Sequence, residues 1–375
     1  MKSVTHAWIA LMALERLKKT PKRNHTAGFL SENLPGFFLG DAFDDHFREQ
    51  ASRFVTLFDR HKDSFLPGAW FPDSVIADNL IGGHTFKLKV PETEKERNQA
   101  VVFPNRLPEY LSAADDFDVP AARFGEPIFR LEDYTLPDRC EALTHTLRDM
   151  VLIQKDQPKG SDILFNDDQI TLYFLMLSHY LADAHVPPHC DSRDFYGPST
   201  IHPDMEKYWD KEILKYFEFD RERGVFDYDI DGAPELMSDP RLRREFRQSP
   251  LYRALETSGR RRWPLRHAKS GPFTEKLLGS GNRKIYDLVK AVCLNSHLLS
   301  TDFIPLSVTA AEYRKLKILK DEKYRKRLEE ISVPIISNAI DVIALVWLLT
   351  WDKYSALKEG IAEKRSDITK EGKIT

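Results

Sequence analysis

Apolar residues recur at helical spacing along most of the chain, which predicts a mostly helical protein. The segments with this spacing are residues 6–19, 41–61, 167–184, 200–214, 282–299 and 324–353. The most apolar segment starts at Asp167, and Pro187 with Pro188 ends it because proline cannot continue an α-helix. Thr5 and Thr200 stand where N-capping residues are expected. The pattern therefore predicts an all-α fold, a multi-helix bundle.

The periodicity weakens in two long stretches, about 85–140 and 215–280, where prolines and mixed charges predict loop-rich insertions. Glycine and proline also predict a loop over 68–73. We expect residues 1–355 to form one helical domain that carries both insertions. Residues 356–375 are highly charged and are expected to form a fraying tail.

Two apolar runs raise the question of a membrane segment. The run that starts at Ala7 is short, and Glu15 and Arg16 follow it with no cleavage site, so it does not have the form of a signal peptide. The run over 331–351 contains Pro334 and Asp341, which favours a buried helix over a membrane span. We therefore expect no transmembrane segment and a cytoplasmic location.

Composition narrows the classes further. The net charge of −3 gives no overall attraction to nucleic acid or membrane. The three cysteines lie far apart in the sequence, which argues against a disulfide framework and agrees with a reducing compartment. Neither a dinucleotide-binding nor a phosphate-loop motif is present in the sequence.

Histidines and carboxylates occur at metal-ligand spacing in the middle of the chain. His179 and Asp183 are four residues apart, and so are His202 and Glu206, so each pair leaves one face of a predicted helix. His189 lies between the pairs, after the double proline. Imidazole and carboxylate together suit zinc. Taken singly, a core histidine or a solvated surface pair explains such residues as well, and the pattern alone leaves both interpretations open.

Short motifs in the same order along the chain resemble the zinc-dependent phospholipase C family, which shares its trinuclear zinc fold with single-strand-specific nucleases. The motifs span residues 6–210, with weaker similarity in the C-terminal helix. They are Thr5-His6-Ala7-Trp8-Ile9, Gly68-Ala69-Trp70-Phe71-Pro72-Asp73, Gly83-His84, Ser178-His179-Tyr180-Leu181-Ala182-Asp183, and Ile201-His202 through Glu206-Lys207-Tyr208-Trp209-Asp210.

The resemblance implies a cluster of three zinc ions between helices. It implies that one zinc is surrounded by Asp73, His84, His179 and Asp183. It implies that the second is held by His189, His202 and Glu206. It implies that the third is held by His6 and by Asp183, which bridges.

Three details depart from the family pattern or extend it. Secreted relatives bind the third zinc with an exposed N-terminal tryptophan, whereas here the Met1 amine is the candidate ligand. The interval from Asp73 to His84 is shorter than in relatives, so Asp78 is an alternative carboxylate. His185 matches a histidine of the nuclease branch and is expected to support the ligands rather than to bind metal.

The resemblance implies a zinc-dependent phosphodiester hydrolase that uses metal-activated water, with Asp73 as the catalytic base. The leading expectation is a phospholipase C-like enzyme acting on a phospholipid. The alternative is a single-strand nuclease or another phosphodiesterase, which the segment from Asp183 to Pro187 and the basic run 241–269 favour. A third hypothesis is a non-catalytic protein that keeps zinc for structure. The sequence leaves the oligomeric state open.

Overall fold

The regular secondary structure is helical apart from two short pairs of strands, within the part of the chain that the computed structural model describes (residues 2–19, 42–76, 83–99, 129–130, 134–156, 166–195, 197–258 and 284–371). This confirms the expected all-α class. The helices are α1 (Ser3–Lys19), α3 (Ala42–Phe65), α4 (Glu94–Gln99), α6 (Leu136–Asp156), α7 (Asp167–Asp183), α8 (Ile201–Leu214), α9 (Pro240–Phe246), α10 (Pro250–Thr257), α12 (Lys284–Phe303), α13 (Ala310–Tyr313) and α14 (Glu322–Glu371). The strand pairs are β1 (Leu88–Lys89) with β2 (Phe129–Arg130), and β3 (Phe219–Asp220) with β4 (Val225–Phe226), both antiparallel.

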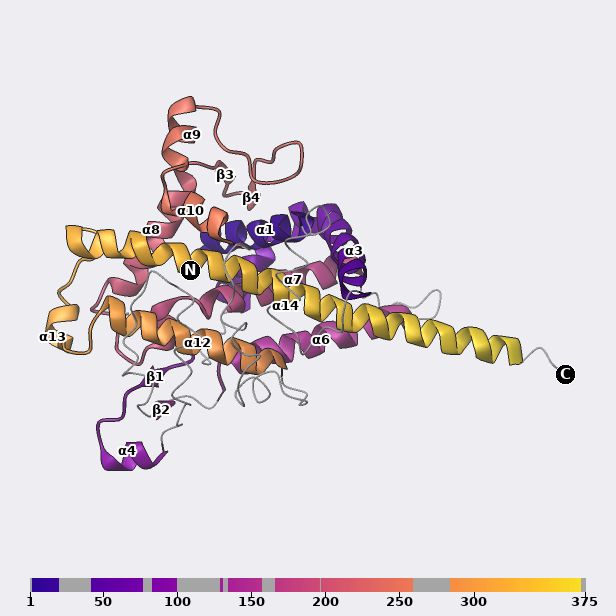
Figure 1. The fold of residues 1–375 in the computed structure, drawn as a ribbon, viewed down its shortest axis with the longest axis horizontal. Helices are drawn as coiled ribbons and strands as arrows, with labels where there is room; N and C mark the ends of the chain where they lie inside the picture. The colour runs from indigo at the N-terminus through magenta and orange to yellow at the C-terminus, as the bar shows by residue number, and fades with distance from the viewer. Residues whose placement is uncertain are drawn as a thin grey trace.

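The long helix α14 runs through the middle of the bundle (Figure 1). It packs against α1, α3, α6, α7, α10 and α12. The indole of Trp347 is fully buried, and its Nε1–H donates to the carbonyl of Phe174 on α7 at 2.8 Å. A single hydrophobic cluster contains buried residues from Val4 to Leu349, so α14 is the central element of that core.

By length and composition, the stretch Glu322–Asp352 of α14 could cross a membrane. In this structure 94% of its most apolar 18-residue window is buried inside the protein. Such burial is that of a core helix, because the neighbouring helices already cover the apolar surface.

The helix α6 was not predicted, and the expected insertion over 85–140 was wrong where it overlaps this helix. The apolar residues of α6 do follow helical spacing, with Leu136, Cys140, Leu143 and Leu147 all buried. Five prolines between residues 85 and 135 and a weak apolar pattern precede the helix, so the sequence did not reveal where it begins. Residues 100–128, in the middle of that predicted insertion, lie outside the described residues.

Three further predictions differ from the structure. Residues 68–73 belong to two short helical turns, η2 (Leu66–Trp70) and η3 (Pro72–Ile76), instead of a loop. The second insertion is structured as far as residue 258, since α10 buries Leu251 and Ala254 and packs against α14. The tail is helical to Glu371 and projects beyond the other helices (Figure 1), as its alanine, leucine, lysine and glutamate content favours.

Candidate metal centre

Helix α7 supplies the two central side chains of the site. Its first turn is fixed by a capping box, in which Asn166 and Gln169 each bond the other's backbone N–H. Its last turns are fully buried, and His179 and Asp183 leave the same face there. Two short turns, Ala184–His185 and η6 (Pro187–Cys190), then carry the chain to His189.

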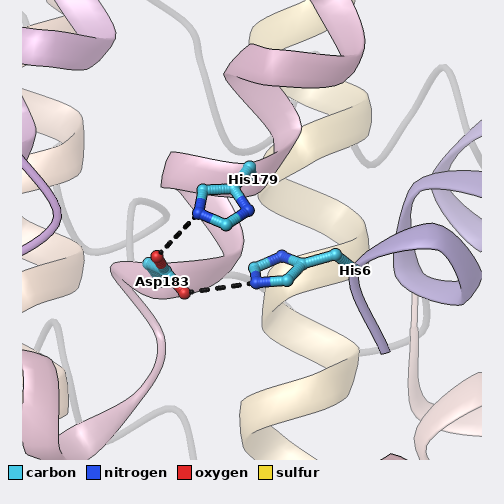
Figure 2. Close-up of side chains that lie close together, drawn as sticks. All are labelled: His6, His179 and Asp183. Carbon is cyan, nitrogen blue, oxygen red and sulfur yellow. Dashed lines mark ion pairs between the residues drawn. The ribbon is translucent and has the colours of Figure 1, made fainter. Parts of the chain in front are cut away.

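The first group of side chains is His6, His179 and Asp183 (Figure 2). His6 comes from α1, and its Nε2 lies 3.5 Å from Oδ1 of Asp183. The Nε2 atom of His179 lies 3.2 Å from the other oxygen, Oδ2. The two imidazole rings stack with centroids 4.0 Å apart. Asp183 therefore faces both histidines, one with each carboxylate oxygen.

The second group shares His179 with the first and adds Asp73 and His84. His84 lies in a turn before β1, and its Nδ1 is 3.2 Å from Nε2 of His179 and 3.1 Å from Oδ2 of Asp183. Asp73 lies on the turn η3, with Oδ1 3.6 Å from each of the two histidines. Its side chain is 42% exposed, so this carboxylate marks the solvent edge of a buried group.

The third group is His189, His202 and Glu206. His202 and Glu206 lie four residues apart on α8, with His202 Nε2 2.8 Å from Oε1 of Glu206. The Nε2 atoms of His189 and His202 are 2.9 Å apart, and His189 Nε2 is 3.8 Å from Oε1 of Glu206. Both Nε2 atoms thus converge on one carboxylate oxygen.

Backbone carbonyls orient two of the histidines. The Nδ1–H of His179 donates to the carbonyl of Ala69 at 2.9 Å, and that of His189 donates to the carbonyl of His84 at 2.8 Å. With Nδ1–H engaged by a carbonyl, Nε2 is the atom that carries the lone pair in the neutral imidazole, and in both residues Nε2 is the atom that faces the group. This arrangement is typical of histidines that bind metal.

Gly68 allows the turn η2 to approach α7 closely enough for the bond from His179 to Ala69. A Cβ atom at residue 68 would lie 2.6 Å from Cδ1 of Leu172 and 3.1 Å from Cβ of Leu175. Both distances are shorter than ordinary contacts between carbon atoms. Close packing therefore favours glycine at this position, and backbone conformation does not demand it.

The ionisation of the first two groups follows from burial and from Asp183. Burial alone lowers the pKa of His179, but the neighbouring Asp183 outweighs it and raises the pKa to about 9. Burial raises the pKa of Asp183, and the positive charges of His189 and His179 outweigh it and hold the pKa well below its usual value. For His6, burial and the neighbouring His179 lower the pKa well below the ordinary value.

In the third group, too, burial and the neighbouring groups set the pKa values. Burial lowers the pKa of His202. Burial raises the pKa of Glu206, but the neighbouring imidazoles of His189 and His202 outweigh it and hold the pKa well below its usual value. The result is an ionised carboxylate beside histidines, which is the protonation state that a cation requires.

The ligand atoms lie close enough together to bind a metal ion, and those of His6 lack a hydrogen-bond partner within the part of the chain that the structure describes. In a tetrahedral zinc site with bonds of about 2.0–2.1 Å, neighbouring ligand atoms lie about 3.3 Å apart. Within each of the three groups the ligand atoms all lie within 4.8 Å of one another. Among the described residues, no hydrogen-bond partner exists for either ring nitrogen of His6, although both are buried. A cation between His6 and Asp183 would supply the missing partner of Nε2, the nitrogen that faces Asp183.

The structure brings together all eight predicted side-chain ligands: His6, Asp73, His84, His179, Asp183, His189, His202 and Glu206. Two details differ from the expected ligand sets: His179 lies in two groups instead of one, and Asp183 lies in one group, that of His6 and His179, instead of two. Met1 and the alternative carboxylate Asp78 lie outside the described residues. So does the densest part of the basic run, residues 259–269.

His185 takes no part in the three groups. Its Nδ1–H donates to the carbonyl of Leu181 at 2.8 Å, and burial lowers its pKa to about 4. It is therefore neutral at pH 7 and lies in the core beside the site.

One supporting contact was not predicted from the sequence. The carboxylate of Asp210 on α8 accepts hydrogen bonds from the backbone N–H and the hydroxyl of Thr5, at 3.0 and 2.6 Å. The bonds join the first turn of α1, which carries His6, to the helix that carries His202 and Glu206. Asp210 stands four residues after Glu206, a spacing that places both on one face of α8 and could have identified it.

The fold and site together define an all-α protein with buried clusters of histidine and carboxylate that could hold metal ions. No protein-family model matches the chain, and no curated protein and no solved structure matches it. The resemblance to zinc-dependent phospholipases C therefore rests on the short motifs given above.

Proposed function

We propose that this protein is a zinc-dependent phosphodiester hydrolase of the phospholipase C type. The observation that carries the proposal is that eight residues converge into three adjoining groups of metal-ligand atoms. These residues come from α1, η3, the turn before β1, α7, η6 and α8. Imidazole and carboxylate donors suit zinc, and three such groups side by side suit a multinuclear centre.

The chemistry of the donor set supports phosphate-ester cleavage. Zinc ions held there would acidify a water molecule to a pKa of about 7 and neutralise charge on a phosphate group. Asp73 is the residue placed to accept a proton, because its carboxylate reaches the solvent edge while its Oδ1 stays 3.6 Å from His84 and His179. A purely structural zinc site is closed to solvent, so the exposure of Asp73 favours catalysis.

The surface beside Asp73 favours an amphiphilic substrate over a nucleic acid. Val75 and Ile76 lie on the same turn as Asp73 and are 66% and 46% exposed. Exposed apolar side chains at the entrance to a site suit acyl chains, whereas single-stranded nucleic acids are bound by basic grooves lined with aromatic residues. We therefore propose a phospholipid substrate, cleaved to release a phosphorylated headgroup.

The test is headgroup release from phosphatidylcholine micelles by zinc-loaded protein. We expect release by the parent and none by His179→Ala. His61→Ala is the matched control, since His61 also pairs with a carboxylate, that of Asp168, but lies outside the three groups. Cleavage of single-stranded DNA in place of lipid would support the nuclease alternative. Zinc-loaded protein that cleaves no phosphate ester would overturn the proposal.

A further inference from the structure

The part of the chain that carries the ligand His189 and leads on to the ligand His202 packs against α12. Three contacts hold this part of the chain on that helix. Ser296 Oγ donates to the carbonyl of Ala184 at 2.5 Å, and the Nδ1–H of His297 donates to the carbonyl of Cys190 at 3.1 Å. The third contact is made by Arg193, which lies between the two ligands in the sequence.

Arg193 folds back onto Asp191, two residues after the ligand His189. Its Nη2 is 2.8 Å from Oδ2 of Asp191 and its Nε is 3.1 Å from Oδ1. A bidentate pair of guanidinium and carboxylate fixes orientation as well as distance. Asp191 is itself buried, so the pair defines the direction in which the chain leaves His189.

The other edge of the same guanidinium caps the C-terminal end of α12. Its N–H groups donate to the carbonyls of Ser300, Ile304 and Pro305. These carbonyls follow the last turns of the helix, where the backbone carries partial negative charge that a cation stabilises. Arg193 therefore connects the metal-binding segment to a rigid helix through the carbonyl groups at its C-terminal end.

The contacts of Arg193 extend to the second ligand through Phe195. The guanidinium lies 4.8 Å from the centre of the buried Phe195 ring. The carbonyl of Phe195 accepts the backbone N–H of His202 at 3.1 Å, where α8 begins. Arg193 thus contacts Asp191, two residues after one ligand, and Phe195, whose carbonyl is bonded to the other ligand directly.

We propose that Arg193 is a positioning residue for the metal group of His189, His202 and Glu206, acting through Asp191 and Phe195. The inference rests on the metal centre of the proposed function, and on no particular substrate. Arginine is required because one planar group must serve a carboxylate on one edge and three carbonyls on the other, which a lysine ammonium cannot do.

The experiment compares zinc binding by the full chain with Arg193→Ala, Arg193→Lys and Arg16→Ala. Arg16 is a matched control, because its side chain is as buried as that of Arg193 (both 14% exposed) and also pairs with a buried carboxylate, that of Asp341. Zinc affinity is measured by competition with a chelator, and the visible spectrum of the cobalt-substituted protein reports ligand geometry at each site.

We expect Arg193→Ala to weaken one zinc equivalent about 10- to 100-fold and to change the cobalt spectrum, with the remaining equivalents unchanged. Arg193→Lys should fall between it and the parent. Arg16→Ala should lower the melting temperature but leave zinc affinity as it is. An Arg193→Ala protein with the parent's zinc affinity and cobalt spectrum would overturn the inference, and so would an equal loss of zinc in Arg16→Ala.

The same measurements separate this inference from the proposed function. A parent protein that takes up no metal refutes the metal centre, and this inference with it. A parent that binds zinc but hydrolyses no phosphate ester refutes the enzyme alone, because the comparison of Arg193 and Arg16 variants is read from zinc binding.

Discussion

Asp183 lies between His6 and the rest of the site, with Oδ1 3.5 Å from Nε2 of His6 and Oδ2 turned toward His179 and His84. One carboxylate thus contacts ligands of two groups, His6 in one and His84 in the other. Its loss should therefore have a larger effect than the loss of His6 alone.

The first prediction concerns this shared carboxylate. Asp183→Asn keeps the size of the side chain but removes its charge, so we expect the protein to lose more than one zinc equivalent. His6→Gln, by contrast, should lose a single equivalent, because His6 belongs to one group only. Metal analysis after dialysis measures both. Equal losses in the two variants would contradict the bridging role.

The second prediction concerns Asp73. Asp73→Asn should lower the rate of phosphate-ester hydrolysis about 10²- to 10⁴-fold, which is the usual contribution of a general base. Thermal stability should be unchanged, because this carboxylate is 42% exposed. Asp149→Asn, which alters an exposed carboxylate on α6, is the control. Loss of stability together with activity would indicate a structural role for Asp73.

The third prediction concerns pH. The pKa of His179 is about 9 in the metal-free fold against 6.5 for a free histidine, so its protonated form stabilises that fold. The contribution is complete below pH 6.5 and is lost as the pH rises through 9. Zinc must displace this proton, so zinc affinity should rise about tenfold per pH unit up to about pH 9.

Chelator competition at several pH values, with protein stability followed by urea unfolding of the metal-free form, measures both effects. Metal-free protein should become less stable toward pH 9 while zinc binding becomes tighter. Zinc affinity that does not change with pH would show that His179 is already neutral at pH 7 in the metal-free protein.

The fourth prediction concerns Gly68. Gly68→Ala places a Cβ atom 2.6 Å from Cδ1 of Leu172, which should destabilise the protein by about 1–3 kcal/mol in urea unfolding. The same shift moves the carbonyl of Ala69 away from His179, so zinc affinity should fall as well. Adding Leu172→Ala removes the shortest of the clashes and should restore part of both losses. An unchanged zinc affinity in the single variant would separate this contact from metal binding.

The sequence predicted the parts of the structure that have a local pattern. The helices with strong apolar periodicity, α1, α7, α8 and α14, were predicted within a few residues of their N-terminal ends. The pairs His179–Asp183 and His202–Glu206 were predicted to share a helix face because the spacing alone fixes that geometry. In the structure each pair lies within one group of ligand atoms.

Contacts without a local pattern could not be predicted. The carbonyl that orients His179 belongs to Ala69, and a backbone carbonyl leaves no trace in the choice of side chain. Arg193 is a single basic residue in an irregular segment, and its partners on α12 lie more than a hundred residues away. Such contacts depend on tertiary packing, which residue spacing does not encode.

The position of His6 on the first helix has a consequence for how the protein assembles. Its partners His179 and Asp183 lie on a helix near the middle of the chain, so joining them requires closure of a long loop, which is slow compared with local helix formation. The group of His6 therefore forms only once α1 has docked on α7. The order in which zinc ions bind during refolding would follow the sequence in which these helices come together, and the ion next to His6 would be among the last to be captured.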